Sequence, residues 1–276
     1  MGKLLRANFS RLRHDRSFIL LTALMVAFGV ILPFMHYIDT VHSGVPWMLD
    51  YSLFTYAFLA PILLSVLSAM FVGNEYSNGT LRNKIIAGNR RSSIYLANLI
   101  VCGFSGILLC VAFMVPHIGF GLLLSGKFGS DLKTVVSYIG LSFALTIAFS
   151  ALFTLVAMLC RSKAHTAAGC VLLVFILIFL GIYITSSLNE PEYLPGYSYT
   201  ENGVTVEEPE TKNPNYVSGT KREVYEFLQD FTSGGQALQL ADMEVENTAR
   251  LAIYDGVILL IFTACGMIVF RRKDLN

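Results

Sequence analysis

Six apolar runs constrain this chain more than any other feature. The hydrocarbon core of a bilayer is about 30 Å thick and an α-helix rises about 1.5 Å per residue, so a spanning helix needs roughly 20 apolar residues. Asp255 is the only Asp, Glu, Lys or Arg inside any run. The runs cover residues 18–38, 51–73, 94–124, 134–160, 166–188 and 251–270. They predict an all-α integral membrane protein with six transmembrane helices.

The composition supports this assignment, because 54% of the residues are apolar and 14% are charged. The first run is too long for the core of a signal peptide, and we expect it to be a retained span. The net charge of +1 gives no support for nucleic-acid binding. We divide the chain into a membrane region, residues 1–188, an outer acidic segment, residues 189–250, and a last span with its tail, residues 251–276.

The basic residues gather in alternate connections between the runs. They number 14 of the 20 Lys and Arg, at positions 3, 6, 11, 13, 16, 82, 84, 90, 91, 161, 163, 271, 272 and 273. Short connections rich in Lys and Arg remain in the cytosol. An even number of spans returns both ends of the chain to one side, so we expect both termini to be cytosolic.

The residues before the first run are typical of an interfacial helix. Leu4, Leu5, Phe9 and Leu12 recur at helical spacing, with basic residues between them. Such a helix lies in the membrane surface with its cations toward anionic headgroups. A plain basic tail that sets the topology is the alternative.

The outer segment divides into two halves. The first half is rich in Pro and Glu and predicts an extended loop, with a small hairpin near Glu201, Asn202 and Gly203. The second half is helical over 223–231, and we expect Gly234 and Gly235 to break this helix. From Gln236 onward the pattern predicts a helix that continues almost directly into the last span.

The polar connection after the second run predicts a short helix over residues 81–87. Thr80 is placed to cap it, and Gly88 and Asn89 to end it. Leu81, Ile85 and Ile86 are expected on one face, and Arg82 and Lys84 are expected to face elsewhere. A helix of this length is marginal alone, so the pattern favours a partner surface, and an ordinary basic loop is the alternative.

The other signals argue against a site of catalysis in this chain. Residues 121–127 imitate the phosphate-binding G-x-x-x-x-G-K pattern, but Phe128 stands where a Ser or Thr should hold magnesium. Pro116 predicts a kink or break near Val115, and the neighbouring His117 is read as a structural residue. The five cysteines have no metal-ligand spacing, so we expect no metal site.

Glu75, Gly79, Thr80 and Lys84, in an E-x-x-x-G-T pattern after the second of six spans, carry a family resemblance. The chain resembles the permease subunits of ATP-binding cassette (ABC) transporters of the type-2 exporter class. Bacterial bacitracin-resistance, lantibiotic-immunity and sodium-extrusion permeases share the pattern, and the resemblance implies that the membrane is a bacterial plasma membrane. The residues after the last span, which include Arg271, Arg272 and Lys273, also resemble the endings of such chains.

The resemblance implies a dimer of permeases, identical or not, that exports a drug, an antimicrobial peptide or another amphipathic compound. It implies that ATP and magnesium bind to separate cytosolic ATPase subunits and that this chain has no cofactor. The short helix would then couple the two proteins through Glu75, Gly79, Thr80, Leu81, Arg82, Lys84 and Ile85. Spans two and five would line the pathway, with Thr55, Tyr56 and Phe58 as candidate residues.

Two other function classes remain open from the residues alone. One is a membrane sensor or scaffold that does not transport, in which the acidic segment binds a ligand. The other is an intramembrane enzyme, which would need His117 and Asp255 to converge.

Overall fold

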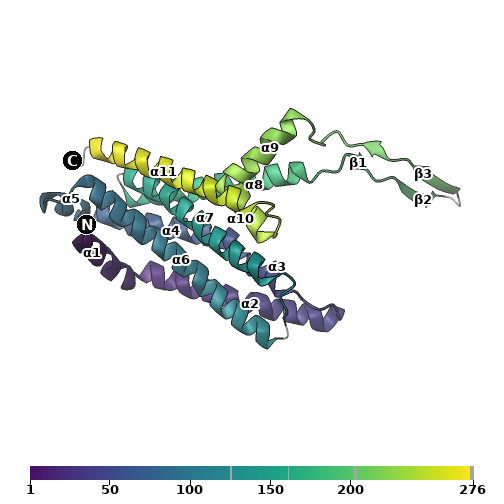
Figure 1. The fold of residues 1–276 in the computed structure, drawn as a ribbon, viewed down its shortest axis with the longest axis horizontal. Helices are drawn as coiled ribbons and strands as arrows, with labels where there is room; N and C mark the ends of the chain where they lie inside the picture. The colour runs from purple at the N-terminus through teal and green to yellow at the C-terminus, as the bar shows by residue number, and fades with distance from the viewer. Residues whose placement is uncertain (125, 161, 202–203, 274–276) are drawn as a thin grey trace.

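The computed structural model describes residues 1–124, 126–160, 162–201 and 204–273, and in these ranges most residues are helical (Figure 1). The helices are α1 Gly2–Arg13, α2 Arg16–Ser43, α3 Leu49–Leu53, α4 Tyr56–Ser77, α5 Thr80–Ile86, α6 Arg91–Leu123, α7 Leu132–Leu159, α8 Lys163–Leu188, α9 Thr220–Phe231, α10 Ser233–Ala241 and α11 Thr248–Arg272. The strands are β1 Tyr193–Leu194, β2 Tyr197–Glu201, β3 Val204–Glu208 and β4 Thr211–Lys212.

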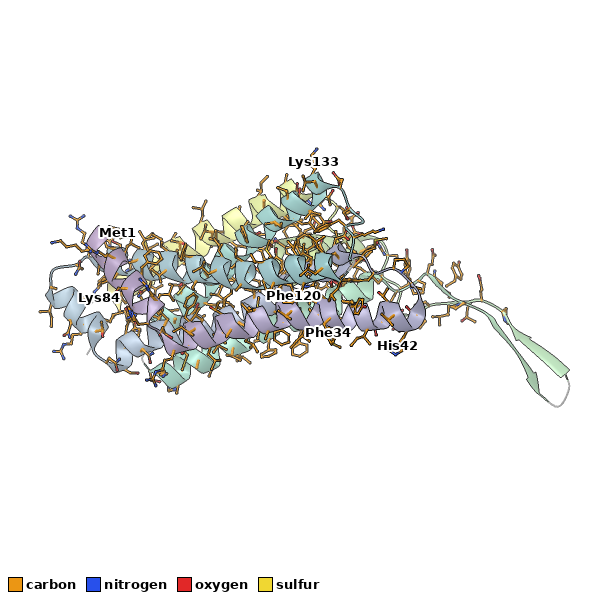
Figure 2. All side chains as sticks on the ribbon, turned by 90° about the horizontal axis from the view of Figure 1, so that it is seen from below. Met1, Phe34, His42, Lys84, Phe120 and Lys133 are labelled. Atoms are coloured by element: carbon orange, nitrogen blue, oxygen red, sulfur yellow. The ribbon has the colours of Figure 1, made fainter. Side chains whose placement is uncertain are left out.

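Six helices in the described ranges are long and apolar enough to cross a membrane, which confirms the prediction of six spans. The second span is formed by α3 and α4 together, and the others are α2, α6, α7, α8 and α11. Figure 2 shows apolar side chains along the length of the bundle, with Phe34 and Phe120 between its ends. Met1 and Lys84 lie at one end, and His42 and Lys133 lie toward the other.

Both termini and α5 lie at the same end of the bundle (Figure 1). We call it the basic end, after the Arg and Lys residues of α1, α5 and the last turn of α11. The opposite end carries α9 and the strands, and we call it the acidic end. The basic connections and the acidic segment therefore lie at opposite ends of the bundle.

The core lies around α4, which contacts α6, α7 and α8. α2 covers α6, and α11 covers α7. The side chains of α4, α6 and α7 are mostly buried, whereas α2, α8 and α11 expose much of their apolar surface. Such surface is expected of helices that face lipid or a second protein.

α6 continues through Pro116 from Arg91 to Leu123, so the helix has no break near Val115, and the kink predicted as the alternative stays a prediction. Proline removes one backbone donor from the helix, but packing against neighbouring helices keeps the rest of it intact. His117, one residue further on, is fully buried and stacks on Phe113 at 5.1 Å.

The outer segment carries a two-stranded ribbon and two helices. β2 pairs with β3 in antiparallel register, with Glu201 opposite Val204, which confirms the predicted hairpin. The turn residues predicted for it, Asn202 and Gly203, lie outside the described residues. The shorter strands β1 and β4 also pair with each other, nearer to the helices.

Two predictions about the helices of this segment are wrong. The break between α9 and α10 is at Thr232, whose side chain accepts a hydrogen bond from the Gly235 N–H and begins α10. Gly234 and Gly235 lie inside the first turn of α10. α10 then ends at Ala241, and Met243 adopts a φ of 58°, so no continuous helix leads into the last span.

α10 is almost completely buried against α8, with further contacts to α4 and α7. A Cβ atom on Gly234 would lie 1.9 Å from the carbonyl oxygen of Leu177 in α8. The two backbones touch because no side chain separates them. α10 is thus part of the membrane bundle, although the sequence places it in the polar segment.

Candidate functional site: a buried ion network at the basic end

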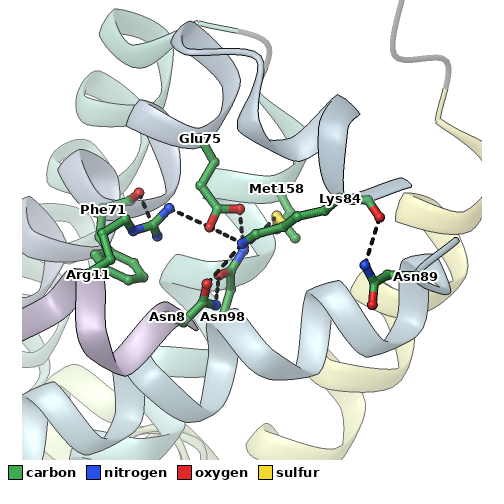
Figure 3. A network of polar contacts seen from close by, with 8 residues as sticks. All are labelled: Asn8, Arg11, Phe71, Glu75, Lys84, Asn89, Asn98 and Met158. Carbon is green, nitrogen blue, oxygen red and sulfur yellow. Dashed lines mark hydrogen bonds and ion pairs between the residues drawn. The ribbon is translucent and has the colours of Figure 1, made fainter. Parts of the chain in front are cut away.

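Glu75, in the last turn of α4, is completely buried at the centre of a polar network (Figure 3). One carboxylate oxygen pairs with Arg11 of α1 at 2.6 Å and with the ammonium group of Lys84 of α5. The other oxygen accepts a hydrogen bond of 3.0 Å from the side-chain amide of Asn98 of α6. Four helices therefore meet at one carboxylate.

Asn8 of α1 closes this network. Its amide group donates a hydrogen bond of 2.7 Å to the side-chain oxygen of Asn98. Its own side-chain oxygen accepts one of 2.9 Å from Lys84. Both asparagines are buried, so water cannot hydrogen-bond to their side chains. The bonds within the network satisfy these polar groups instead.

Two cations share one carboxylate in this network. The side chain of Lys84 is 12% exposed. Burial lowers the pKa of Lys84, and the nearby Glu75 carboxylate opposes this shift. The guanidinium of Arg11 lies 3.7 Å from the centroid of the Phe71 ring and donates to the Phe71 carbonyl oxygen. Contacts with the ring face and the carbonyl offset part of the cost of bringing Arg11 out of water.

The turn into α5 brings Lys84 to Glu75. Gly79 adopts a φ of +65°, which side chains disfavour, and stands at the N-cap of α5. At the other end of α5, the Asn89 side chain donates a hydrogen bond of 2.9 Å to the carbonyl oxygen of Lys84. Gly88 follows the helix with a φ of +82°. The predicted stop signals at Gly88 and Asn89 are confirmed.

Three predictions about α5 are wrong. Thr80 is the first residue of the helix, because the left-handed turn at Gly79 already starts it. Leu81 is buried and Ile85 packs against the core of the chain, whereas Ile86 is 74% exposed. Consecutive residues of a helix lie about 100° apart, and in α5 this rotation turns Ile86 away from the covered side that holds Leu81 and Ile85. Arg82 is exposed, as expected, but Lys84 turns inward.

The three predicted pathway residues lie around the break between α3 and α4. Thr55 and Phe58 are half-buried. Tyr56 is fully buried, and its hydroxyl lies 2.7 Å from that of Ser142 on α7. The structure therefore places Tyr56 in the core of the chain and not on a surface that a substrate could touch.

Sequence reasoning missed three members of the network: Asn8, Arg11 and Asn98. Asn8 and Arg11 are three residues apart, so they share one face of α1. Arg11 was expected to face lipid headgroups, and the structure instead pairs it with Glu75. A polar residue at position 8 between Leu4 and Leu12, both buried, was the one available signal.

A metal site or a catalytic pair would need suitable side chains close together among the described residues. Among the described residues no group of three or more His, Cys, Asp or Glu side chains could hold a metal ion. His117 lies 3.1 Å from the hydroxyl of Ser52. In the part of the chain that the structure describes, no hydrogen bond or ion pair joins His117 to Asp255. The arrangement required by an intramembrane enzyme is not formed by these two residues.

The family model for ABC-2 family transporter proteins matches residues 4–181, which is well over half of the chain. The matched region contains most of α1, the first four spans, α5 and most of α8, and thus the whole buried ion network. No curated protein sequence matches the chain. With six candidate spans and this match, the chain is a multi-pass membrane protein that belongs to the ABC-2 family of transporter proteins, as a membrane component.

Proposed function

We propose that this chain is the permease subunit of an ATP-driven exporter and that α5 receives force from a separate ATPase subunit. The observation that carries the proposal is the position of α5. It lies at the basic end, exposes Ile86 and Arg82, and is tied through Lys84 to the buried Glu75. A partner that displaces α5 would therefore displace the end of α4.

The basic end also suggests how the chain is oriented in the membrane. We propose that this end faces the cytosol of a bacterial cell and that the acidic end faces outward, because Lys and Arg in short connections are retained inside. ATP and magnesium would then bind to the partner subunits. Neither would bind to this chain.

The exposed faces of α2, α8 and α11 support a second proposal, that two permease subunits associate within the membrane. A single subunit leaves extended apolar helix faces without a protein partner, at Leu172, Ile176 and Phe179 of α8 for example. The pathway would form between two copies or between two related chains. The substrate class that we propose is an amphipathic compound, such as a drug or an antimicrobial peptide.

Ile86→Asp tests the role of α5. We would co-express the tagged chain with a candidate ABC ATPase from a neighbouring reading frame, purify the complex and measure ATP hydrolysis. The ATPase is expected to co-purify with the natural chain and not with Ile86→Asp, because an apolar contact would acquire a charge. Val45→Asp is the matched control, since Val45 is 65% exposed and lies after α2 at the acidic end.

Three results would contradict parts of the proposal. ATP hydrolysis by the purified chain alone would contradict the division of labour between subunits. Full binding of the ATPase to Ile86→Asp would show that α5 does not receive it. An intact, ATP-hydrolysing complex that changes neither the accumulation of amphipathic compounds nor resistance to them would favour a membrane sensor instead.

A further inference from the structure

Lys273, directly after α11, joins the end of the last span to two other spans. Its ammonium group donates hydrogen bonds of 2.9 Å to the carbonyl oxygens of Met158 and Cys160, at the end of α7. It donates a third, also of 2.9 Å, to the hydroxyl of Tyr76 on α4. It also lies 4.3 Å from the centroid of the Tyr76 ring.

These contacts satisfy groups that a helix leaves unpaired. The last carbonyl groups of an α-helix have no partner within the helix, and a lysine commonly binds them. Here the lysine comes from another span, and Tyr76 reinforces it by donating a hydrogen bond of 2.7 Å to the same Met158 carbonyl oxygen. The end of α7 is thus bound by side chains from both α4 and the residue after α11.

Arg91 holds the end of α11 from the other side. It is the first residue of α6, shortly after α5 in the chain. Its guanidinium donates hydrogen bonds of 3.2 Å to the carbonyl oxygens of Phe270 and Arg271, and a further one to that of Lys273. We call Tyr76, Arg91, Met158, Cys160 and Lys273 the Lys273 clasp.

The clasp adjoins the ion network through consecutive residues of α4. Glu75 connects α4 to α1, α5 and α6, and Tyr76 connects it to α7 and the end of α11. Two adjacent side chains of one helix turn therefore contact five other helices or helix ends. A displacement of this turn of α4 would therefore act both on the helices bound to Glu75 and on the helix ends bound to Tyr76.

We propose that Lys273 is a positioning residue that carries movement of the α5–Glu75 joint into spans 4 and 6. Without it, span 6 loses its bond to Tyr76 and span 4 keeps only the hydrogen bond from Tyr76 to Met158, so movement of α5 and Glu75 is passed to span 2 and only weakly to spans 4 and 6. The inference rests on the proposed function of α5. It also gives a role to Lys273, the basic residue directly after α11, which the ion network leaves unexplained.

Lys273→Met tests the inference, because methionine keeps the length of the side chain and removes its charge and donors. We would reconstitute the complex with its ATPase in lipid nanodiscs and measure hydrogen–deuterium exchange with and without ATP and vanadate. In the natural chain, nucleotide is expected to alter exchange at the end of α4 and at the far ends of α7 and α11, near Leu132 and Thr248. In Lys273→Met the change on α7 and α11 should fall by roughly fivefold or more, while the change on α4 remains.

Arg272→Met is the matched control, since Arg272 is exposed and precedes Lys273. It should respond as the natural chain does, and Lys273→Arg should restore most of the response. If Lys273→Met fails to fold, Tyr76→Phe keeps the ring and removes the hydroxyl that accepts from Lys273 and donates to Met158. The bonds from Lys273 to Met158 and Cys160 remain, so the variant should show a smaller loss on α7 and α11.

An undiminished response of α7 and α11 in Lys273→Met would overturn the inference and leave Lys273 as a helix cap. An equal loss in Arg272→Met would do the same, because it would show a general effect of basic charge. Failure of the ATPase to bind the natural chain would contradict the proposed function instead, so the two failures are distinguishable.

Discussion

Asn8 donates a hydrogen bond of 2.7 Å to Asn98, although 90 residues separate them in the chain. Asn8 is 1% exposed and Asn98 is not exposed at all. The pair fixes α1 against the third span through a polar contact inside an apolar interface. We therefore regard α1 as an integral part of the bundle and not as a tail or a loosely bound surface helix.

This pair predicts a strongly non-additive double-mutant cycle. Asn8→Ala and Asn98→Ala each leave a buried partner without its hydrogen bond, which costs about 1–3 kcal/mol in unfolding free energy. The double variant removes both polar groups and should cost less than the sum. Thermal unfolding in detergent of the four proteins measures the coupling, and additive losses would show that the bond contributes little.

Glu75→Gln is expected to destabilise the chain and to abolish coupled ATP hydrolysis. It leaves Arg11 and Lys84 without their carboxylate, and breaking a buried ion pair costs about 3–5 kcal/mol. Glu226→Gln is the control, because Glu226 forms an exposed pair with Arg222 within α9, where the effect should stay within about 1 kcal/mol. Unfolding temperature and ATPase stimulation measure both variants, and equal stability of the two would refute the role of Glu75.

Gly234→Ala is expected to disrupt the contact between α10 and α8. The new Cβ atom would meet the backbone of Leu177, which cannot move aside as a flexible side chain can. Overpacking of this kind costs about 1–3 kcal/mol or more. Gly119→Ala is the control, since nothing lies within 4 Å of a Cβ there. Limited proteolysis of the outer segment, together with unfolding temperature, should separate the two variants.

Leu81 and Ile86 should respond in opposite ways to truncation. Leu81 is 2% exposed, so Leu81→Ala removes buried apolar volume and should cost about 2–5 kcal/mol of stability. Ile86 is largely exposed, so Ile86→Ala should leave the stability of the isolated chain nearly unchanged and weaken ATPase binding. Unfolding curves and co-purification distinguish the two effects. Loss of stability in Ile86→Ala alone would contradict the orientation of α5.

The spans were predictable because each is set by local composition. A run of about 20 apolar residues has one stable form in lipid, a helix, whatever its neighbours are. The hairpin at Glu201 and Val204 was also predictable, since turn residues act locally. The course of α10 was not, because its burial depends on the fit between Gly234 and the distant backbone of Leu177.

The ion network was only partly predictable, because it joins residues that are far apart in the sequence. Glu75 and Lys84 lie nine residues apart and were singled out through the family pattern. Asn98 is part of a long apolar run and Asn8 of an amphipathic helix, and neither position reveals the other. Ile86 was wrongly placed on one face with Leu81 and Ile85, because the sequence of α5 alone does not show which of these residues the surrounding spans cover.

The way in which the two-stranded ribbon is attached to α8 has a further consequence. One leg of the ribbon leaves the end of α8 and the other leads into α9, and Gln229 of α9 donates a hydrogen bond of 3.0 Å to Thr185 of α8. Both legs are therefore rooted in the fifth span. The ribbon extends well beyond the helices (Figure 1), so it is a long extension attached to that span. A small rotation of the fifth span would therefore move the far end of the ribbon through a much larger distance than the span itself.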